Sequence, residues 1–296
     1  MKSNPRIVSL LPGATEWVCA LGLQQRLVGV SHECDFPDAV NQLPRVTRSR
    51  IPENASSIEI DKAVRQHSDA RISLYELDEK VLLGLRPDLI LTQSLCNVCA
   101  VSERDVLSSI AEMDHSCGIL DLSAQSFAGV MDDAKRIVEA TGQRAASAEA
   151  VDSLQSRIDR VRQQTDSSGR PKVTLLEWTD PLFCAGHWTP ELIQWAGGDD
   201  PIGIAGQPSR RITEAELEAA DPDLLLVAAC GLSEQRTRSD LQQLQQKPFW
   251  QRLRCVQESQ VHAFDGSAFF NRAGPRLVDA LERVAMLVNL WQQETK

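Results

Sequence analysis

The chain lacks any long apolar run, any block of basic residues and any regular spacing of its cysteines. Of its 296 residues, 42% are hydrophobic and 24% are charged, and the formal net charge is −10. A surface for nucleic acid or for an anionic membrane needs clustered cations, so the scattered Lys and Arg residues argue against both partners. No segment approaches the roughly 20 apolar residues that span a bilayer, so we expect no membrane insertion.

The N-terminus carries no recognisable leader. Residues 1–6 lead directly into the apolar run at residues 7–11, which is too short for the core of a signal peptide, and no small-residue cleavage site follows. We therefore expect the chain as given to stay in the cytoplasm, with the periplasm as the alternative if a leader was removed. The eight cysteines include one CxxC pair, and in a reducing compartment they would be thiols, metal ligands or core residues.

Apolar runs alternate with amphipathic segments along the chain, which predicts the α/β class. The predicted strands of the first half are residues 7–11, 27–31, 89–92 and 118–122. The predicted strands of the second half are residues 173–176, 224–227 and 261–264. A strand, a helix and a strand within about thirty residues make a βαβ unit, so we expect two Rossmann-like lobes with parallel-rich sheets.

A helical pattern of about twenty residues separates the two halves, with apolar residues at spacings of three and four. We therefore predict an N-terminal α/β lobe at residues 1–143, a spanning helix at 144–166 and a C-terminal α/β lobe at 167–296. The phrases at residues 85–91 and 219–226 each contain Pro-Asp followed by an apolar run. Their likeness indicates that both lobes share one plan.

Three local predictions concern the first half. Thr15 is expected to cap a helix over residues 16–21, and Asp78 to cap a helix over residues 79–85. Residues 38–73 have a weak, turn-rich pattern, which predicts surface or cleft loops.

The turn at residues 181–191 combines a thiol, an imidazole and an indole. It follows the predicted strand at residues 173–176, so we place it beyond the carboxyl end of a strand, where ligands bind in open α/β sheets. Gly186 beside His187 would let the backbone come close to a bound molecule. The alternative is a loop whose aromatic side chains simply cap a core.

Other side chains with binding chemistry also follow predicted strands, and these loops would face one cleft if the lobes face each other. Aromatic residues are only 5% of the chain but gather in the same loops, where flat apolar walls suit a large planar ligand. Ordinary loop packing is the alternative. The predicted ligand-binding residues are His32, Glu33, Arg48, Tyr75, Trp178, Phe183, His187, Trp188, Cys230, Phe269, Phe270 and Arg272.

A second group of residues would suit a metal ion. His32 and Cys34 follow one strand, and Cys96 and Cys99 follow another, so together they offer one imidazole and three thiolates to zinc or iron. The cysteines could equally form a redox pair or pack as small apolar side chains. A nucleophilic Cys184 would need an orienting group and an oxyanion hole beside its histidine. The sequence shows neither, so we predict no catalytic residue and no enzyme.

Several phrases occur together in this chain: IVSLLPGATE at residues 7–16, LVGVS at 27–31 and RPDLI at 86–90. Together they resemble the substrate-binding proteins of cobalamin and ferric-siderophore ABC importers. The phrases similar to the cobalamin-binding branch are GHW at residues 186–188, residues 212–213 with 221–223, and NRAGPRLV at 271–278. The resemblance covers nearly the whole chain.

This resemblance implies two α/β lobes joined by one long rigid helix, with a ligand held between them. The implied ligand is cobalamin or a related corrinoid or metal chelate; a ferric siderophore gripped by Arg48, Arg50 or Arg272 is the alternative. Family members dock on a permease through one acidic residue per lobe, whereas Lys80 and Ala215 stand in the nearest registers here. These departures predict a relative that binds its small-molecule ligand without delivering it to a channel. We expect the protein to be a monomer.

Overall fold

The computed structural model describes residues 4–295 except residues 53–54, 71–72, 95–102 and 166–168. The chain forms two compact units. Unit 1 comprises Met1–Ser123 and Met131–Asp152, and unit 2 comprises Ala124–Val130 and Ser153–Lys296. Each unit is built around one four-stranded sheet, so the α/β class is confirmed.

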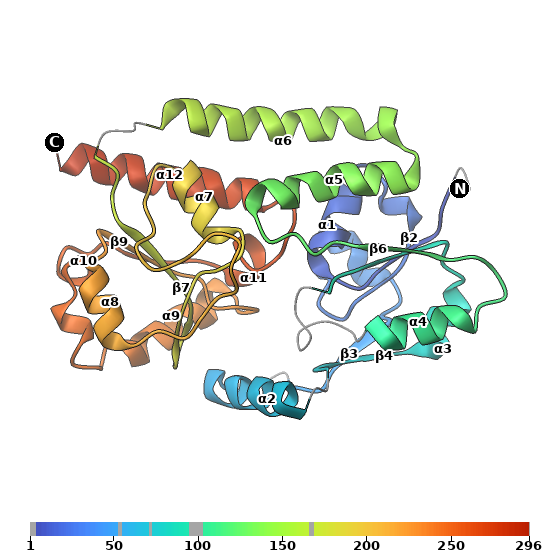
Figure 1. Cartoon of the computed structure of the whole chain (residues 1–296), viewed down its shortest axis with the longest axis horizontal. Helices are drawn as coiled ribbons and strands as arrows, with labels where there is room; N and C mark the ends of the chain where they lie inside the picture. Colours follow the sequence, from blue (N-terminus) through green and yellow to red (C-terminus); the bar gives the residue numbers. More distant parts are fainter. Residues whose placement is uncertain (1–3, 53–54, 71–72, 95–102, 166–168, 296) are drawn as a thin grey trace. The chain divides into compact units, whose positions relative to one another are not determined.

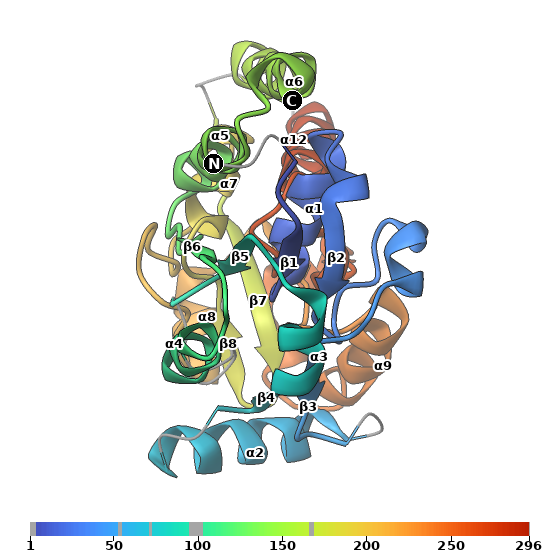
Figure 2. The ribbon, with the colours of Figure 1, turned by 90° about the vertical axis from the view of Figure 1, so that its right-hand side faces the viewer.

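Unit 1 holds a parallel sheet in the order β2-β1-β5-β6 (Figure 2). The strands are β1 (Ile7–Ser9), β2 (Leu27–Val30), β5 (Leu89–Thr92) and β6 (Gly118–Asp121), each within a predicted run. The helices of this part of the chain are α1 (Pro12–Ala20), η1 (Gln24–Arg26), η2 (Asp38–Gln42), α2 (Ser57–Ala70), α3 (Glu79–Leu85), α4 (Glu103–Ala111) and α5 (Phe127–Thr141). The central strands β1 and β5 are buried throughout, as continuous apolar runs in parallel sheets usually are.

The structure corrects two predictions in unit 1. Helix α1 begins at Pro12, whose missing N–H needs no partner in the first turn, so Thr15 lies inside the helix and does not cap it. Helix α2 occupies a stretch predicted as loops. It was missed because few apolar residues mark it, and one of them, Ile58, remains 59% exposed.

A short antiparallel pair of strands flanks α2 in the sequence. β3 (Thr47–Ser49) pairs with β4 (Tyr75–Leu77), with Thr47 opposite Leu77 and Ser49 opposite Tyr75. Asp78 follows β4 and caps α3 by accepting the N–H of Val81 at 3.1 Å, as predicted.

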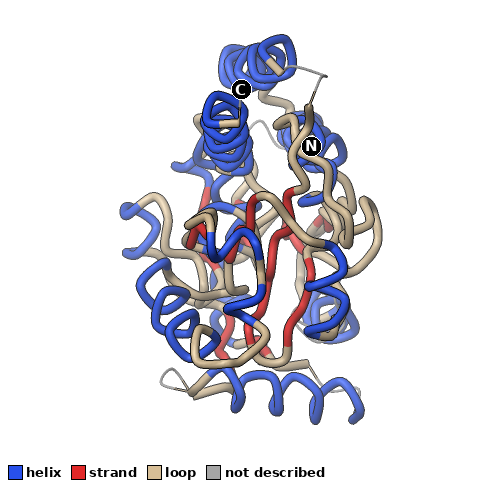
Figure 3. The backbone as a smooth tube through the Cα atoms, turned by 90° about the vertical axis from the view of Figure 1, so that its left-hand side faces the viewer, coloured by secondary structure: helices blue, strands red, loops and turns tan. Residues whose placement is uncertain are grey.

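Unit 2 holds a sheet in the order β10-β9-β7-β8. Figure 3 draws the strands of the structure in red and its helices in blue. Its strands are β7 (Val173–Thr179), β8 (Leu182–Cys184), β9 (Leu224–Val227) and β10 (Val261–Ala263). β10, β9 and β7 are parallel, and β8 is antiparallel to β7. The remaining helices are α7 (Thr189–Trp195), α8 (Glu214–Ala220), α9 (Glu234–Leu244), η3 (Trp250–Arg252), α10 (Arg254–Gln257), α11 (Gly266–Phe269) and α12 (Leu277–Glu294).

The long helix α6 (Arg144–Gln164) lies within the predicted range (Figure 1). The boundary between the two units falls inside this helix. Within unit 1, the hydroxyl of Ser147 donates to the carbonyl of Leu21 at 3.1 Å. Within unit 2, Arg157 pairs with Asp279 and Glu282 of α12 at 2.5 and 2.6 Å. The predicted lobe boundaries and the role of α6 as a rigid spacer stay predictions.

The same turn precedes a central strand in each unit. α3 ends at Arg86 and α8 at Asp221, with φ of 48° and 44° in the left-handed region. Each is followed by Pro and Asp, and then by β5 or β9. The two turns have the same backbone form, as the similar phrases in the sequence predicted.

The aspartate of each turn joins two neighbouring strands. In unit 1, the carboxylate of Asp88 accepts the N–H of Arg6 at 2.9 Å, and its own N–H donates to the Arg6 carbonyl at 2.8 Å. In unit 2, Asp223 makes the same two bonds with Lys172, at 2.7 and 2.8 Å. Arg6 precedes β1 and Lys172 precedes β7, so each aspartate sets the register of a central strand pair.

We expect Asp223→Ala to lower the free energy of unfolding by about 1–3 kcal/mol, because it removes a charge-assisted bond at the start of β7. Asp223→Asn keeps an acceptor oxygen and should cost less. Urea denaturation measures both. The control is Asp132→Ala, which removes an exposed ion pair with Lys135 and should cost less than about 1 kcal/mol. Equal losses for Asp132→Ala and Asp223→Ala would contradict the role given to Asp223.

Candidate functional site

Strand ends in unit 1 bring His32, Thr47 and Tyr75 together. Nδ1 of His32 lies 2.7 Å from the hydroxyl oxygen of Thr47, which also accepts the backbone N–H of His32 at 2.9 Å. The ring of Tyr75 stands edge-on to the imidazole, with 4.7 Å between the ring centroids. The hydroxyl of Tyr75 donates to Oε1 of Glu33 at 2.5 Å. We call these four residues the His32 cluster.

The outer nitrogen of His32, Nε2, is buried and has no hydrogen-bond partner in the protein. Leaving a buried polar atom unpaired costs about 1–3 kcal/mol, which a bound group could recover. Burial lowers the pKa of His32, so its imidazole is neutral at pH 7. If Nδ1 carries the proton, Nε2 presents a lone pair suited to a metal; in the other tautomer it donates a hydrogen bond.

Cys34 follows His32 by two residues in the chain and is 1% exposed. Its sulfur is 3.0 Å from the hydroxyl of Thr15 and 3.3 Å from that of Ser31. Cys96 and Cys99 lie outside the described residues. In the part of the chain that the structure describes, no three His, Cys, Asp or Glu side chains are grouped to hold a metal ion. The four-ligand metal site therefore stays a prediction.

Arg48 is turned toward an acidic partner. Its guanidinium donates to the carboxylate of Asp78 at 2.5 Å, while 73% of its side chain is exposed. The bond from Val81 N–H and the one from Arg48 hold the pKa of Asp78 below its usual range. The positive charge of Arg48 is thus already balanced within unit 1.

In unit 2, the turn that carries His187 lies elsewhere than predicted. β7 continues to Thr179, and the chain returns as the antiparallel strand β8. Because β8 runs backward, Ala185 leaves the sheet opposite Leu175, with its N–H donating to the Leu175 carbonyl at 2.9 Å. Cys184, His187 and Trp188 therefore do not follow the carboxyl end of a parallel strand.

A second loop, residues 206–212, runs alongside this turn. The N–H of His187 donates to the carbonyl of Gln207 at 2.6 Å, and the N–H of Gly206 donates to the carbonyl of His187 at 2.9 Å. A Cβ atom on Gly186 would lie 2.1 Å from the backbone nitrogen of Ser209. Glycine is therefore required here because another part of the chain comes close to it, whereas a close approach of a bound molecule was expected.

Several predicted aromatic residues are packed in unit 2. Trp188 is 7% exposed, and its indole N–H donates to the carbonyl of Phe270 at 2.7 Å. Phe270 is 1% exposed and stands edge-on to Phe264, with centroids 5.3 Å apart. Trp178 is 9% exposed and donates to the carbonyl of Asp180. This packing matches the alternative that loop aromatics cap a core.

The other predicted residues of unit 2 keep more accessible surface. Phe183, His187, Phe269 and Arg272 are half-buried, and Cys230 is exposed. Nδ1 of His187 is buried without a partner, and burial lowers the pKa of this imidazole. Ligand contact by the predicted residues of either unit, and a crevice shared by both sets of loops, stay predictions.

Thr47, whose hydroxyl oxygen contacts Nδ1 and the backbone N–H of His32, is not among the residues predicted from the sequence. Thr47 is 1% exposed and orients His32, but only the pairing of β3 with β4 brings it there. No local motif marks it.

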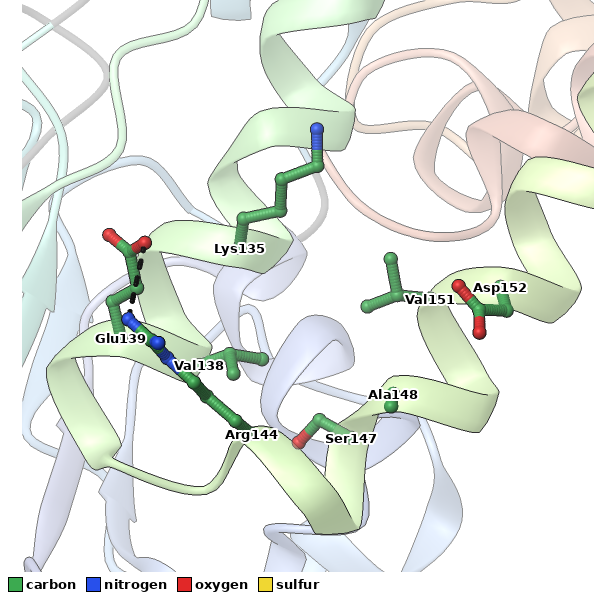
Figure 4. Close-up of a pocket in the computed structure, with 8 residues that line it drawn as sticks. All are labelled: Lys135, Val138, Glu139, Arg144, Ser147, Ala148, Val151 and Asp152. Carbon is green, nitrogen blue, oxygen red and sulfur yellow. Dashed lines mark ion pairs between the residues drawn. The ribbon is translucent and has the colours of Figure 1, made fainter.

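A separate hollow of about 250 Å³ lies between α5 and α6 in unit 1 (Figure 4). Val138, Ala148 and Val151 line it, and the ion pair between Glu139 and Arg144 lies at its rim, at 3.9 Å. Its volume is below the roughly 300–1,000 Å³ typical of ligand pockets, and none of the predicted ligand-binding residues lines it.

Two α/β units, each built around one four-stranded sheet, fit a ligand-binding protein of the α/β type. A family model described as "Periplasmic binding protein" matches residues 7–268, and the chain belongs to this family. The family consists of substrate-binding proteins of ABC importers, which confirms the prediction of ligand binding without catalysis.

Known proteins are similar to this chain over nearly its whole length. The Vitamin B12-binding protein of Vibrio cholerae is 23% identical over 300 residues, which cover 98% of this chain and 91% of the relative. The solved periplasmic vitamin B12 binding protein BtuF of V. cholerae gives a TM-score of 0.71 at 21% identity, covering 97% and 98% of the two chains. The periplasmic heme-binding protein RhuT of Roseiflexus sp. RS-1 gives 0.72 at 20% identity, covering 97% and 99%. These structures establish the two-lobe fold class.

The members of this family are periplasmic by name. Across the described ranges, every helix is too short or too polar to cross a bilayer.

We expect Gly186→Ala to destabilise the protein by about 1–3 kcal/mol, because the new methyl group would overlap the backbone at Ser209. Urea denaturation measures the loss. Gly84→Ala is the matched control, since a Cβ at Gly84 of α3 meets no atom within 4 Å. That control should be neutral or slightly stabilising. A Gly186→Ala variant as stable as wild type would show that residues 207–209 are not held against the turn.

Proposed function

We propose that this protein binds cobalamin or a related metal tetrapyrrole, and that His32 contacts the ligand. The observation that carries this proposal is the buried, unpartnered Nε2 of His32. A neutral imidazole in this state suits two tasks: coordination of a cobalt or iron ion, or a hydrogen bond to an amide of the ligand.

The remaining residues of the His32 cluster orient the imidazole. A metal-binding histidine usually donates its second N–H to an oxygen, which fixes both the tautomer and the ring orientation. Thr47 offers that oxygen to Nδ1 at 2.7 Å. Tyr75 limits rotation of the ring from the side, and Glu33 in turn holds Tyr75. Thr47 and Tyr75 therefore supply a supporting oxygen and an aromatic wall to the imidazole of His32, whose Nε2 is the atom that we propose contacts the ligand.

The relatives favour a macrocyclic metal complex as ligand. The similar proteins named above are described as binding vitamin B12 or heme, which share a flat macrocycle around a metal ion. A ferric siderophore gripped by Arg48 has less support, because the guanidinium of Arg48 already pairs with Asp78. The predicted zinc or iron group at Cys96 and Cys99 is not needed for this function.

We further propose that delivery to a permease does not follow the usual docking scheme. In unit 2, Glu216 accepts the N–H and the hydroxyl of Thr213 and pairs with Arg210 at 2.8 Å, so its charge is engaged locally. In unit 1, Lys80 lies in the first turn of α3, at the position where the resemblance implies an acidic docking residue. A protein that does not dock on a permease in the usual way could act in the cytoplasm, which is the location we propose. The periplasm, where the family members are found, is the alternative.

Titration with cyanocobalamin, aquocobalamin and hemin tests the proposal. We expect a micromolar or tighter Kd for at least one of them by calorimetry. His32→Phe should weaken binding at least about tenfold, or about 1.4 kcal/mol. If Nε2 coordinates the metal, the absorbance of aquocobalamin or hemin should shift with wild type and not with His32→Phe.

Two variants sharpen this experiment. Thr47→Val removes the oxygen that holds Nδ1 and should weaken binding about tenfold, whereas His67→Gln, on helix α2, should leave the Kd unchanged. No heat and no spectral change with any of the three compounds at high micromolar concentration would reject the proposal. Equal affinities of His32→Phe and wild type would reject the role of His32.

A further inference from the structure

Three polar residues lie together at the carboxyl edge of the sheet in unit 1. β5 and β6 are parallel neighbours, and their last residues, Thr92 and Asp121, stand opposite each other. Ser94 follows the end of β5 by two residues, and Ser123 follows the end of β6 by two. Ligands of open α/β sheets bind beyond this edge. We call Ser94, Asp121 and Ser123 the Asp121 cluster.

The carboxylate of Asp121 collects the hydrogen-bond donors of this cluster. Oδ1 accepts the hydroxyl of Ser123 at 2.5 Å and the backbone N–H of Ser94 at 3.0 Å, and Oδ2 accepts the hydroxyl of Ser94 at 2.7 Å. The same N–H of Ser94 donates to the hydroxyl oxygen of Ser123 at 2.7 Å. Because a carboxylate only accepts, the protons of both hydroxyl groups are used within the cluster.

The cluster therefore offers acceptor atoms to a bound molecule. A hydroxyl oxygen whose proton is used still has its lone pairs. Ser94 is exposed, while Asp121 and Ser123 are half-buried. A molecule that meets Ser94 finds hydrogen-bond acceptors beside a negative charge. Such a surface favours an N–H donor, as in an amide, and repels a carboxylate.

The neighbouring helix α5 adds no free cation to this edge. Arg136 of α5 pairs with Asp133 at 2.9 Å. Burial raises the pKa of Asp133, and the charge of Asp121 adds to this rise. The negative charge of Asp121 thus reaches the side chains around it, and an anionic part of a ligand at Ser94 would meet the same repulsion.

The spacing of the strands relates the cluster to His32. β2 and β5 lie on either side of β1 (Figure 2), and neighbouring strands are about 4.8 Å apart, so β2 and β5 are separated by about 10 Å. His32 follows the end of β2 by two residues, as Ser94 follows the end of β5. A macrocycle that meets His32 would therefore bring its peripheral side groups toward Ser94.

We propose that the Asp121 cluster selects the ligand by its side groups, with Ser94 accepting an amide N–H and Asp121 orienting Ser94 and repelling carboxylates. The selection rests on the proposed function, because it acts on the rim of a ligand whose centre is near His32. Cobalamin carries amide side chains around its corrin ring, whereas heme carries propionate carboxylates. The cluster therefore favours a corrinoid over heme.

Calorimetry with the full chain tests this proposal by a ratio of affinities. The probes are cyanocobalamin and its monocarboxylic acids, in which one side-chain amide is replaced by a carboxylate. Wild type should bind cyanocobalamin at least about tenfold more tightly than at least one of these acids, because a site that accepts an N–H rejects an analogue without it. It should also bind cyanocobalamin more tightly than hemin.

Two variants should lower this ratio. Asp121→Asn removes the charge but keeps an acceptor oxygen for Ser94, so the ratio should fall about tenfold. Ser94→Ala removes the exposed acceptor and should lower the ratio mainly by weakening cyanocobalamin; this variant serves if Asp121→Asn does not fold. A structural role alone would weaken both compounds equally and leave the ratio unchanged. The control is Asp132→Asn, an exposed carboxylate of α5 paired with Lys135, which should keep the wild-type ratio.

The outcomes separate this proposal from the proposed function. A wild-type ratio near one, or an unchanged ratio in Asp121→Asn or in Ser94→Ala, would overturn the selection by the Asp121 cluster. Tighter binding of hemin than of cyanocobalamin would agree with the proposed function and still overturn the selection. Absence of binding by every probe would reject the proposed function and the selection together.

Discussion

The bond between an aspartate carboxylate and the backbone at the start of a central strand organises each unit. Asp88 binds Arg6 in unit 1, and Asp223 binds Lys172 in unit 2. Since side chains alternate along a strand, a shift of one residue would move every side chain to the other face of the sheet. These two bonds therefore decide which loops emerge at the carboxyl edges and which residues those loops present.

The two units use these edges differently. In unit 1, the loop after β2 presents His32, with an engaged Nδ1 and an unpartnered Nε2. In unit 2, the loops are packed against one another, and Trp188 uses its indole N–H for the carbonyl of Phe270. Each unit nevertheless holds at least one buried imidazole nitrogen without a partner among the described residues, for example Nε2 of His32 in unit 1 and Nδ1 of His187 in unit 2. The members of this family bind a substrate for an importer and do not transform it, so neither unit needs catalytic groups.

The predictions that succeeded depend on short-range patterns. The bounds of α3 agree with the predicted helix because Asp78 caps it and a left-handed residue before Pro ends it. The failures have two causes: elements too short to show a period, and contacts between segments distant in sequence. β8 was predicted as part of a turn, since three residues are too few to show a period. Thr15 carries a capping side chain, but its hydroxyl is used by Cys34, which lies 19 residues away.

The sequence by itself determined the α/β class, the long helix α6 and the family resemblance, because periodicity, caps and continuous motifs are local. Only the tertiary structure decided that Thr47 and Tyr75 surround His32, and that Gly186 approaches Ser209. These contacts join residues brought together by strand pairing, and no local pattern records such pairing.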